Sequence, residues 1–149
     1  MANKKITDLT DYPGGVFANT NEMEMSVDIA GTFASRKVSW SDIKNSVTIQ
    51  SVTSSATVTP LVTDDEVIIT AQAVGLTLAN PSGTAVQGQV MLIRIKDNAT
   101  SQTIAYGTEY RALGVTLPTA TTISKTHYLG MIYNVTDTKW DVIGVNEEA

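Results

Sequence analysis

Apolar and polar side chains alternate along most of the chain after residue 46, which is the pattern of strands with one buried face. Nine strands follow from this alternation: Val47–Val52, Ala56–Thr59, Glu66–Ala71, Val74–Ala79, Gln89–Lys96, Gln102–Tyr106, Tyr110–Leu113, Thr126–Asn134 and Lys139–Val145. Breaker pairs such as Asn80-Pro81 and Asp97-Asn98 lie between them and predict turns. No helical pattern is long enough to make parallel crossovers, so we expect antiparallel pairing.

Two of these strands indicate where the core lies. The strand over 89–96 has Met91, Ile93 and Ile95 on one face, whereas Val90 and Leu92 make the other face apolar for half its length, before Arg94 and Lys96. The strand over 126–134 has one face with Leu129, Met131, Tyr133 and Val135, and another with Tyr128, Gly130, Ile132 and Asn134. A strand that is apolar on both faces is buried on both, or has one face against a second subunit.

The first part of the chain, residues 1–46, has a different pattern. Residues 1–22 have little periodicity and predict an extended arm. Alternation over Met25–Ile29, a turn at Gly31-Thr32 and a return over Lys37–Trp40 predict a β-hairpin. Ser41–Asn45 could form one helical turn. We therefore expect an arm and hairpin over 1–46 and a second domain over 47–149.

Composition supports an all-β chain, because Thr, Val and Ile together make up one residue in three. We expect an antiparallel β-sandwich or jelly roll with an N-terminal extended arm and β-hairpin. The net charge of −5 argues against nucleic-acid binding, which needs a basic face. The N-terminus has no apolar segment of a secretory signal, and the longest aliphatic run, Val90–Ile93, is too short for membrane insertion. We expect synthesis in a host cytoplasm.

The residues that could perform chemistry form no catalytic motif. His127 is the only histidine, and we expect it to be a partly exposed structural residue. The acidic run Asp64-Asp65-Glu66 lacks the spaced ligands of a calcium loop and predicts a solvated turn. No nucleophile elbow or phosphate loop is present. We therefore expect no enzyme activity, no catalytic residue, no cofactor and no metal.

Three aromatic residues are candidate ligand contacts. Tyr106, Tyr110 and Trp140 could stack on a sugar ring if they lie on the surface. The competing and favoured interpretation is that Trp140 belongs to the core and the tyrosines are interface or edge residues.

Two parts of the chain resemble bacteriophage structural proteins. Lys5–Leu9, followed by the segment Arg36–Ile43, resembles the short N-terminal units of phage tail-fibre and other virion fibre proteins. The segments that resemble a β-sandwich module of phage tail fibres and phage structural proteins are Ile93–Asn98, Tyr110–Pro118, Tyr128–Asn134 and Lys139–Val142. Together these segments extend over most of the chain. The resemblance is one of overall shape and does not include the residues of a functional site. One departure from a complete fibre is that no long repetitive shaft separates the two parts.

The resemblance implies a homotrimeric virion component of decoration, head-fibre or tail-fibre type, bound to the major capsid or tail protein. An ordered arm of about 20 residues would lose about 1–2 kcal/mol of backbone entropy per residue, so it needs a large contact area. The expected function is therefore to bind and stabilise the particle. The alternative is a module of a phage fibre that binds a host-surface carbohydrate.

Overall fold

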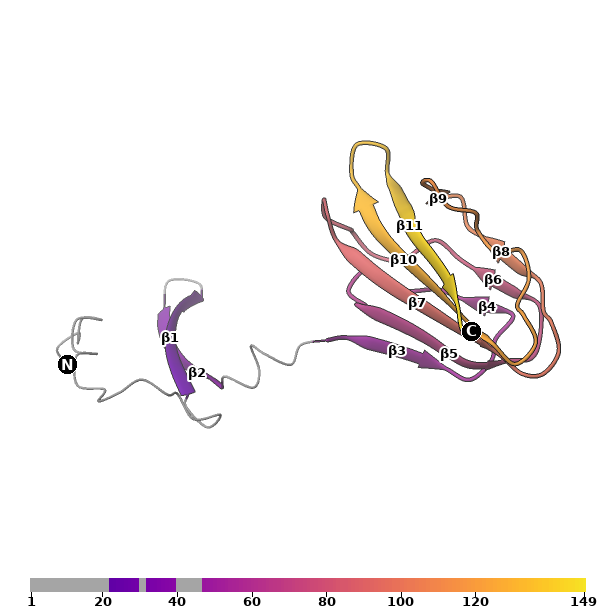
Figure 1. The fold of residues 1–149 in the computed structure, drawn as a ribbon. Coiled ribbons are helices and arrows are strands. Elements are labelled where there is room, and N and C mark those ends of the chain that lie inside the picture. Colours follow the sequence, from indigo (N-terminus) through magenta and orange to yellow (C-terminus); the bar gives the residue numbers. More distant parts are fainter. Residues whose placement is uncertain (1–21, 30–31, 40–46) are drawn as a thin grey trace. The chain divides into compact units, whose positions relative to one another are not determined.

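A computed structural model describes residues 22–29, 32–39 and 47–149 (Figure 1). Every regular element in these ranges is a strand, and the strands form sheets of two, six and three members. The expected all-β class is thereby confirmed for the described residues. Contacts divide the chain into two compact units, Met1–Ser46 and Val47–Ala149. The expected arm, except Glu22, and the expected helical turn at 41–45 lie outside the described residues.

The first unit contains the hairpin that alternation predicts. β1 (Glu22–Ile29) pairs antiparallel with β2 (Thr32–Ser39), so that Ile29 lies opposite Thr32 and Glu22 lies opposite Ser39. Because β2 already begins at Thr32, the connection is shorter than the sequence pattern predicts.

The second unit contains nine strands, and each corresponds to one of the nine expected strands, with ends that differ by two residues at most. The six-stranded sheet has the order β3 (Ile49–Val52), β5 (Glu66–Gln72), β7 (Val90–Asp97), β10 (Thr126–Asn134), β11 (Lys139–Glu147) and β9 (Tyr110–Ala112). The three-stranded sheet has the order β4 (Thr57–Val58), β6 (Leu76–Leu78) and β8 (Ile104–Tyr106).

The expectation of antiparallel pairing is wrong for much of this unit. β10 pairs antiparallel with β7 and β11, but β5 is parallel to both β3 and β7, and β9 is parallel to β11. The three-stranded sheet is parallel throughout. Parallel neighbours need a long crossover, commonly a helix. Here the crossover is a strand of the other sheet, since the chain runs from β3 to β8 by alternating between the two sheets.

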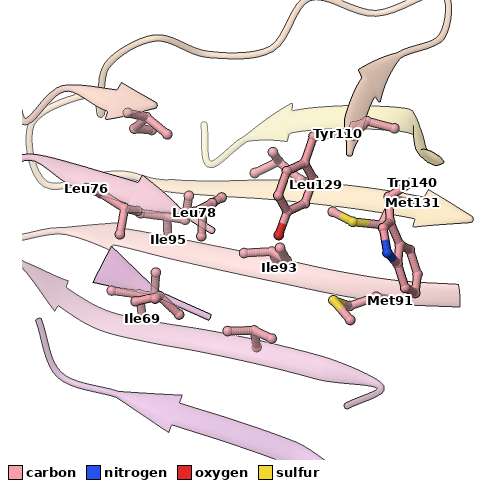
Figure 2. Packing of buried hydrophobic residues seen from close by; sticks show 14 of the residues in the cluster. Ile69, Leu76, Leu78, Met91, Ile93, Ile95, Tyr110, Leu129, Met131 and Trp140 are labelled. Atoms are coloured by element: carbon pink, nitrogen blue, oxygen red, sulfur yellow. The ribbon is translucent and has the colours of Figure 1, made fainter. Parts of the chain in front are cut away.

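One core cluster unites the two sheets. Its buried side chains from the three-stranded sheet are Val58, Leu76, Leu78 and Ile104, and those from the six-stranded sheet include Val67, Ile69, Ile93, Ile95, Leu129, Met131, Trp140 and Val142. Figure 2 shows the side chains of β6 in the same cluster as those of β5, β7 and β10. The face with Met91, Ile93 and Ile95 is buried as expected. The buried face of β10 is confirmed at Leu129 and Met131, but it ends before Val135, which is exposed beyond the strand.

A buried amide fixes one of the crossovers. Gln72, at the end of β5, has no exposed surface, and its Nε2 donates to the carbonyls of Ser55 at 2.8 Å and Val74 at 2.6 Å. Its Oε1 accepts from the Ser55 backbone N–H at 3.3 Å. Because a buried amide is costly without partners, these bonds hold the connection between β3 and β4 against the end of β5.

We predict that truncation of Leu78 to alanine destabilises the whole second unit. Leu78 is fully buried on β6 and belongs to the core cluster that both sheets share. The loss of a buried leucine costs about 2–5 kcal/mol of unfolding free energy. Urea unfolding followed by tryptophan fluorescence measures it, because Trp140 lies in the other sheet.

The neighbouring exposed residue provides the control. Thr77→Ala removes an exposed side chain from the same strand and is expected to change the unfolding free energy by about 0.5 kcal/mol or less. Equal effects of the two variants would contradict a core shared between the sheets.

Candidate functional site

The three aromatic residues that were candidate sugar contacts lie mostly inside the unit. Trp140 has no exposed surface and Tyr110 has 7%, so neither ring offers a face to a dissolved sugar. Trp140 packs against Tyr133 with ring centroids 5.2 Å apart. Tyr106 is partly buried and meets Tyr110 edge to face at 5.9 Å. The rings of Trp140 and Tyr110 thus act as core side chains.

The two tyrosine hydroxyls hold loops in place. Tyr106 Oη donates to the carbonyl of Pro118 at 2.9 Å, and Tyr110 Oη donates to the carbonyl of Ala79 at 3.0 Å. Burial raises the pKa of both phenols well above the ordinary value, so both remain protonated donors. These bonds attach β8 and β9 to segments that lie far away in the sequence.

The sequence predicts a solvated turn for the acidic run at 64–66, and the structure agrees with this only at Asp65, which is exposed. Asp64 is buried, and its Oδ2 accepts from the Leu61 backbone N–H at 2.7 Å. Asp65 Oδ2 accepts from the Thr48 backbone N–H at 2.7 Å, and Glu66 is paired with Arg94. The three carboxylates thus have separate structural partners. In the described part of the chain, no group of three or more His, Asp or Glu residues could hold a metal ion.

His127 is buried, with 6% exposure, and not partly exposed as expected. Its Nε2 accepts a hydrogen bond from the Thr122 backbone N–H at 3.2 Å, and it lies 3.5 Å from a carboxylate oxygen of Glu147. Through this hydrogen bond the imidazole connects β10 to the preceding loop.

A second buried carboxylate was not recognised from the sequence. Asp97, at the end of β7, accepts from the Thr121 hydroxyl at 2.6 Å and from the Ser124 backbone N–H at 2.9 Å. Burial alone would raise its pKa, but these hydrogen bonds, with others from the Ala99 and Thr100 backbone, outweigh burial and lower the pKa. The sequence indicated only a turn here, because Thr121 and Ser124 are remote along the chain.

The outer face of the six-stranded sheet, opposite the core, has an apolar half. In register, Leu92 lies opposite Gly130, and Gly130 lies opposite Gly144 on the next strand. Val90 lies opposite Ile132 two positions further along. These five residues form what we call the outer apolar area. Val90 is 60% exposed and Leu92 is 36% exposed, although both belong to strands that also build the core.

Ion pairs border this area and occupy the rest of the face. They join Arg94 Nη1 to Glu66 Oε1 at 3.3 Å, Lys96 Nζ to Glu148 Oε2 at 2.9 Å, and Arg111 Nε to Asp141 Oδ1 at 2.7 Å. The hydrogen bonds from Arg111 lower the pKa of the buried Asp141 carboxyl, despite the opposing effect of burial. Arg111 Nη2 also contacts Asp137 Oδ2 at 2.8 Å, so these three cations face four carboxylates.

A shallow open depression of about 280 Å³ lies on the polar half of this face, lined by Ile68, Ile69, Thr70, Arg94, Lys96 and Thr126. Both of its cationic side chains already have partners. Arg94 contacts Glu66 and its guanidinium carbon lies 5.4 Å from the ring centroid of Tyr128, while Lys96 contacts Glu148 and the Ser124 carbonyl. Both charges thus face a carboxylate, while Arg94 Nε has no hydrogen-bond partner among the described residues.

Comparisons with known proteins identify no relative. No family model matches the chain, and neither a curated protein nor a solved structure matches it. Among the described residues there is also no helix with the length and hydropathy of a membrane span.

We predict that the second unit loses stability in acid and that Asp97→Asn reduces this loss. The pKa of Asp97 in the folded chain lies below the unfolded value of about 3.9, so the stabilisation is complete above that pH and is lost as the pH falls through the folded pKa. Urea unfolding at pH 7 and pH 3 measures it. Asp97→Asn should be less stable than the parent at pH 7 and change less between the two pH values.

A second variant separates the carboxylate from its donor. Thr121→Val removes the buried hydroxyl that donates at 2.6 Å and should also reduce the difference between pH 7 and pH 3. An acid sensitivity that is identical in the parent and both variants would contradict the role assigned to Asp97.

Proposed function

We propose that the chain is a non-enzymatic structural component of a phage virion. In this proposal it is a homotrimer of decoration, head-fibre or tail-fibre type, located in the virion, which binds the major capsid or tail protein and stabilises the particle. Residues 47–149 associate with other copies, and residues 1–46 attach the protein to the particle. The resemblance of Lys5–Leu9, Arg36–Ile43 and the later segments to phage structural proteins provides the context.

The observation that supports this proposal most strongly is the outer apolar area. Large aliphatic side chains in the middle of a sheet face are usually covered, and contiguous exposed ones mark sites of interaction. Leu92 lies between the buried Met91 and Ile93 of the same strand, so its exposure is not that of a strand end or a loop, whereas Val90 is the first residue of β7. A partner surface would remove them from water.

The structural roles of the buried carboxylates support the part of the proposal that gives the chain no enzyme activity. The best-buried acids of the second unit, Asp64, Asp97 and Asp141, each accept structural hydrogen bonds from neighbouring loops or strands. A general acid or base needs a geometry that leaves it available to a substrate proton. These three groups are occupied in holding the fold.

We propose further that the two sheets of the second unit form a β-sandwich, because one core cluster contains side chains from both. A jelly roll is a less suitable description, since that fold consists of antiparallel Greek keys and most pairs here are parallel. The alternative function, binding of a host-surface glycan, has no support from the positions of Trp140 and Tyr110, which are buried.

We predict that deletion of residues 1–22 produces a folded homotrimer that no longer joins the particle. The core of the second unit and the side chains packed against it include no residue before Val52, so the deletion should leave the circular dichroism spectrum and association unchanged. Particles of the virus that encodes the chain, grown with either form, are purified, and the protein is quantified by mass spectrometry. Incorporation of the truncated form at the stoichiometry of the full chain would contradict the role of the arm, and absence of the full chain from particles would contradict the virion assignment.

A further inference from the structure

One ring nitrogen of the buried His127 has two neighbours that require opposite protonation states of it. Its Nε2 accepts the backbone N–H of Thr122 at 3.2 Å and lies 3.5 Å from Oε2 of Glu147. A backbone N–H can only donate, so its bond requires an unprotonated Nε2. An ionised carboxylate can only accept, so a hydrogen bond to Glu147 requires a protonated Nε2. The two bonds at this atom therefore exclude each other.

The segment 121–125, which precedes β10, contains a strained backbone position. Ser124 has a φ of 59°, in the left-handed region that residues other than glycine rarely adopt. Such a conformation persists only where the surroundings fix it. Two side chains outside the segment accept its backbone N–H groups: Asp97 accepts from Ser124 at 2.9 Å, and His127 accepts from Thr122. Loss of the histidine acceptor therefore favours relaxation of the segment.

The charged groups around the imidazole decide which bond a proton would favour. On β11, Glu147 is the register partner of His127, and its Oε1 lies 3.5 Å from Nζ of Lys125 in the segment. On β7 the register partner is the apolar Ile95, and Asp97 at the end of that strand accepts from the segment. The strands of the three-stranded sheet contain no acidic or basic residue. Glu147 is thus the acceptor that a protonated Nε2 would meet.

Both carboxylates beside the segment remain charged in mild acid. The hydrogen bond from the Thr122 hydroxyl lowers the pKa of the Glu147 carboxyl below its ordinary value. Burial alone would raise the pKa of Asp97, but its hydrogen bonds outweigh burial and lower the pKa. Histidine is the side chain whose charge ordinarily changes between about pH 5 and 8. In this cluster, the imidazole is therefore the group that can respond to a change of pH in that range.

From this geometry we propose that His127 is a pH-sensitive switch that controls the opening of the segment 121–125. In the neutral state Nε2 accepts the Thr122 N–H and the segment is closed. When Nε2 takes a proton from water, the imidazolium donates to Glu147, the Thr122 N–H loses its acceptor, and the segment opens. Return to neutral pH removes the proton and closes it again. The switch goes beyond the proposed function, because it depends neither on a virion nor on association of copies.

The test measures hydrogen exchange of the Thr122 amide by NMR in the full chain at pH 7.5 and pH 5. The result is expressed as a protection factor, which corrects for the pH dependence of the exchange reaction itself. In the parent, protection of Thr122 should fall about tenfold at pH 5, whereas that of Leu129 in the middle of β10 should not change. His127→Gln keeps an acceptor but cannot take the charge, so its Thr122 protection should be equal at both pH values.

A surface variant keeps the test decisive if the buried His127→Gln does not fold. Glu147→Gln changes an exposed side chain and removes the charge that attracts the imidazolium, so the loss of Thr122 protection at pH 5 should be smaller than in the parent. Glu148→Gln is the matched control, because this neighbouring carboxylate pairs with Lys96 instead, and it should behave as the parent does. Equal protection of Thr122 at both pH values in the parent would overturn the proposal, and so would an undiminished loss in His127→Gln or Glu147→Gln.

Discussion

The second unit depends on the burial of one apolar cluster between two sheets that cannot be completed separately. Each parallel neighbour in the three-stranded sheet is reached only after the chain has added a strand to the six-stranded sheet. Burial of Leu76 and Leu78 therefore requires Ile69 and Ile93 to be in place on the facing strands. The free energy gained by burying apolar side chains is roughly proportional to the apolar area removed from water. This shared core is therefore the main source of stability.

The same constraint determines which surface remains for function. A two-layer arrangement buries one face of each sheet and leaves the other in water, so the six-stranded sheet presents a broad outer face. Charged side chains on that face have partners of opposite charge within the chain. Its aliphatic side chains leave water only if another surface covers them. The buried carboxylates and tyrosine hydroxyls of the second unit hold its strands and loops in place.

The sequence predicted the strands well because alternation is local. All nine strands of the second unit and the buried face of β7 follow from it. It could not predict which strands are neighbours, since β3 to β8 alternate between sheets in a way that no local pattern records. The burial of Asp97 was missed for the same reason, because its donors Thr121 and Ser124 are remote along the chain. Asp64 accepts from the nearby Leu61 N–H, and nothing in the acidic run itself indicated that this side chain is buried. The register that places Gly130 opposite Gly144, with a shift beside it, could likewise not be predicted from the sequence.

The most direct test of this account is the mass of the full chain in solution, determined by light scattering over a range of concentrations. An outer face that exists to be covered by further copies predicts a particle of three chains, each of 15.9 kDa, that persists on dilution to working concentrations. A mass of one chain at all concentrations would show that the exposed aliphatic side chains do not bring copies together, and would contradict the account.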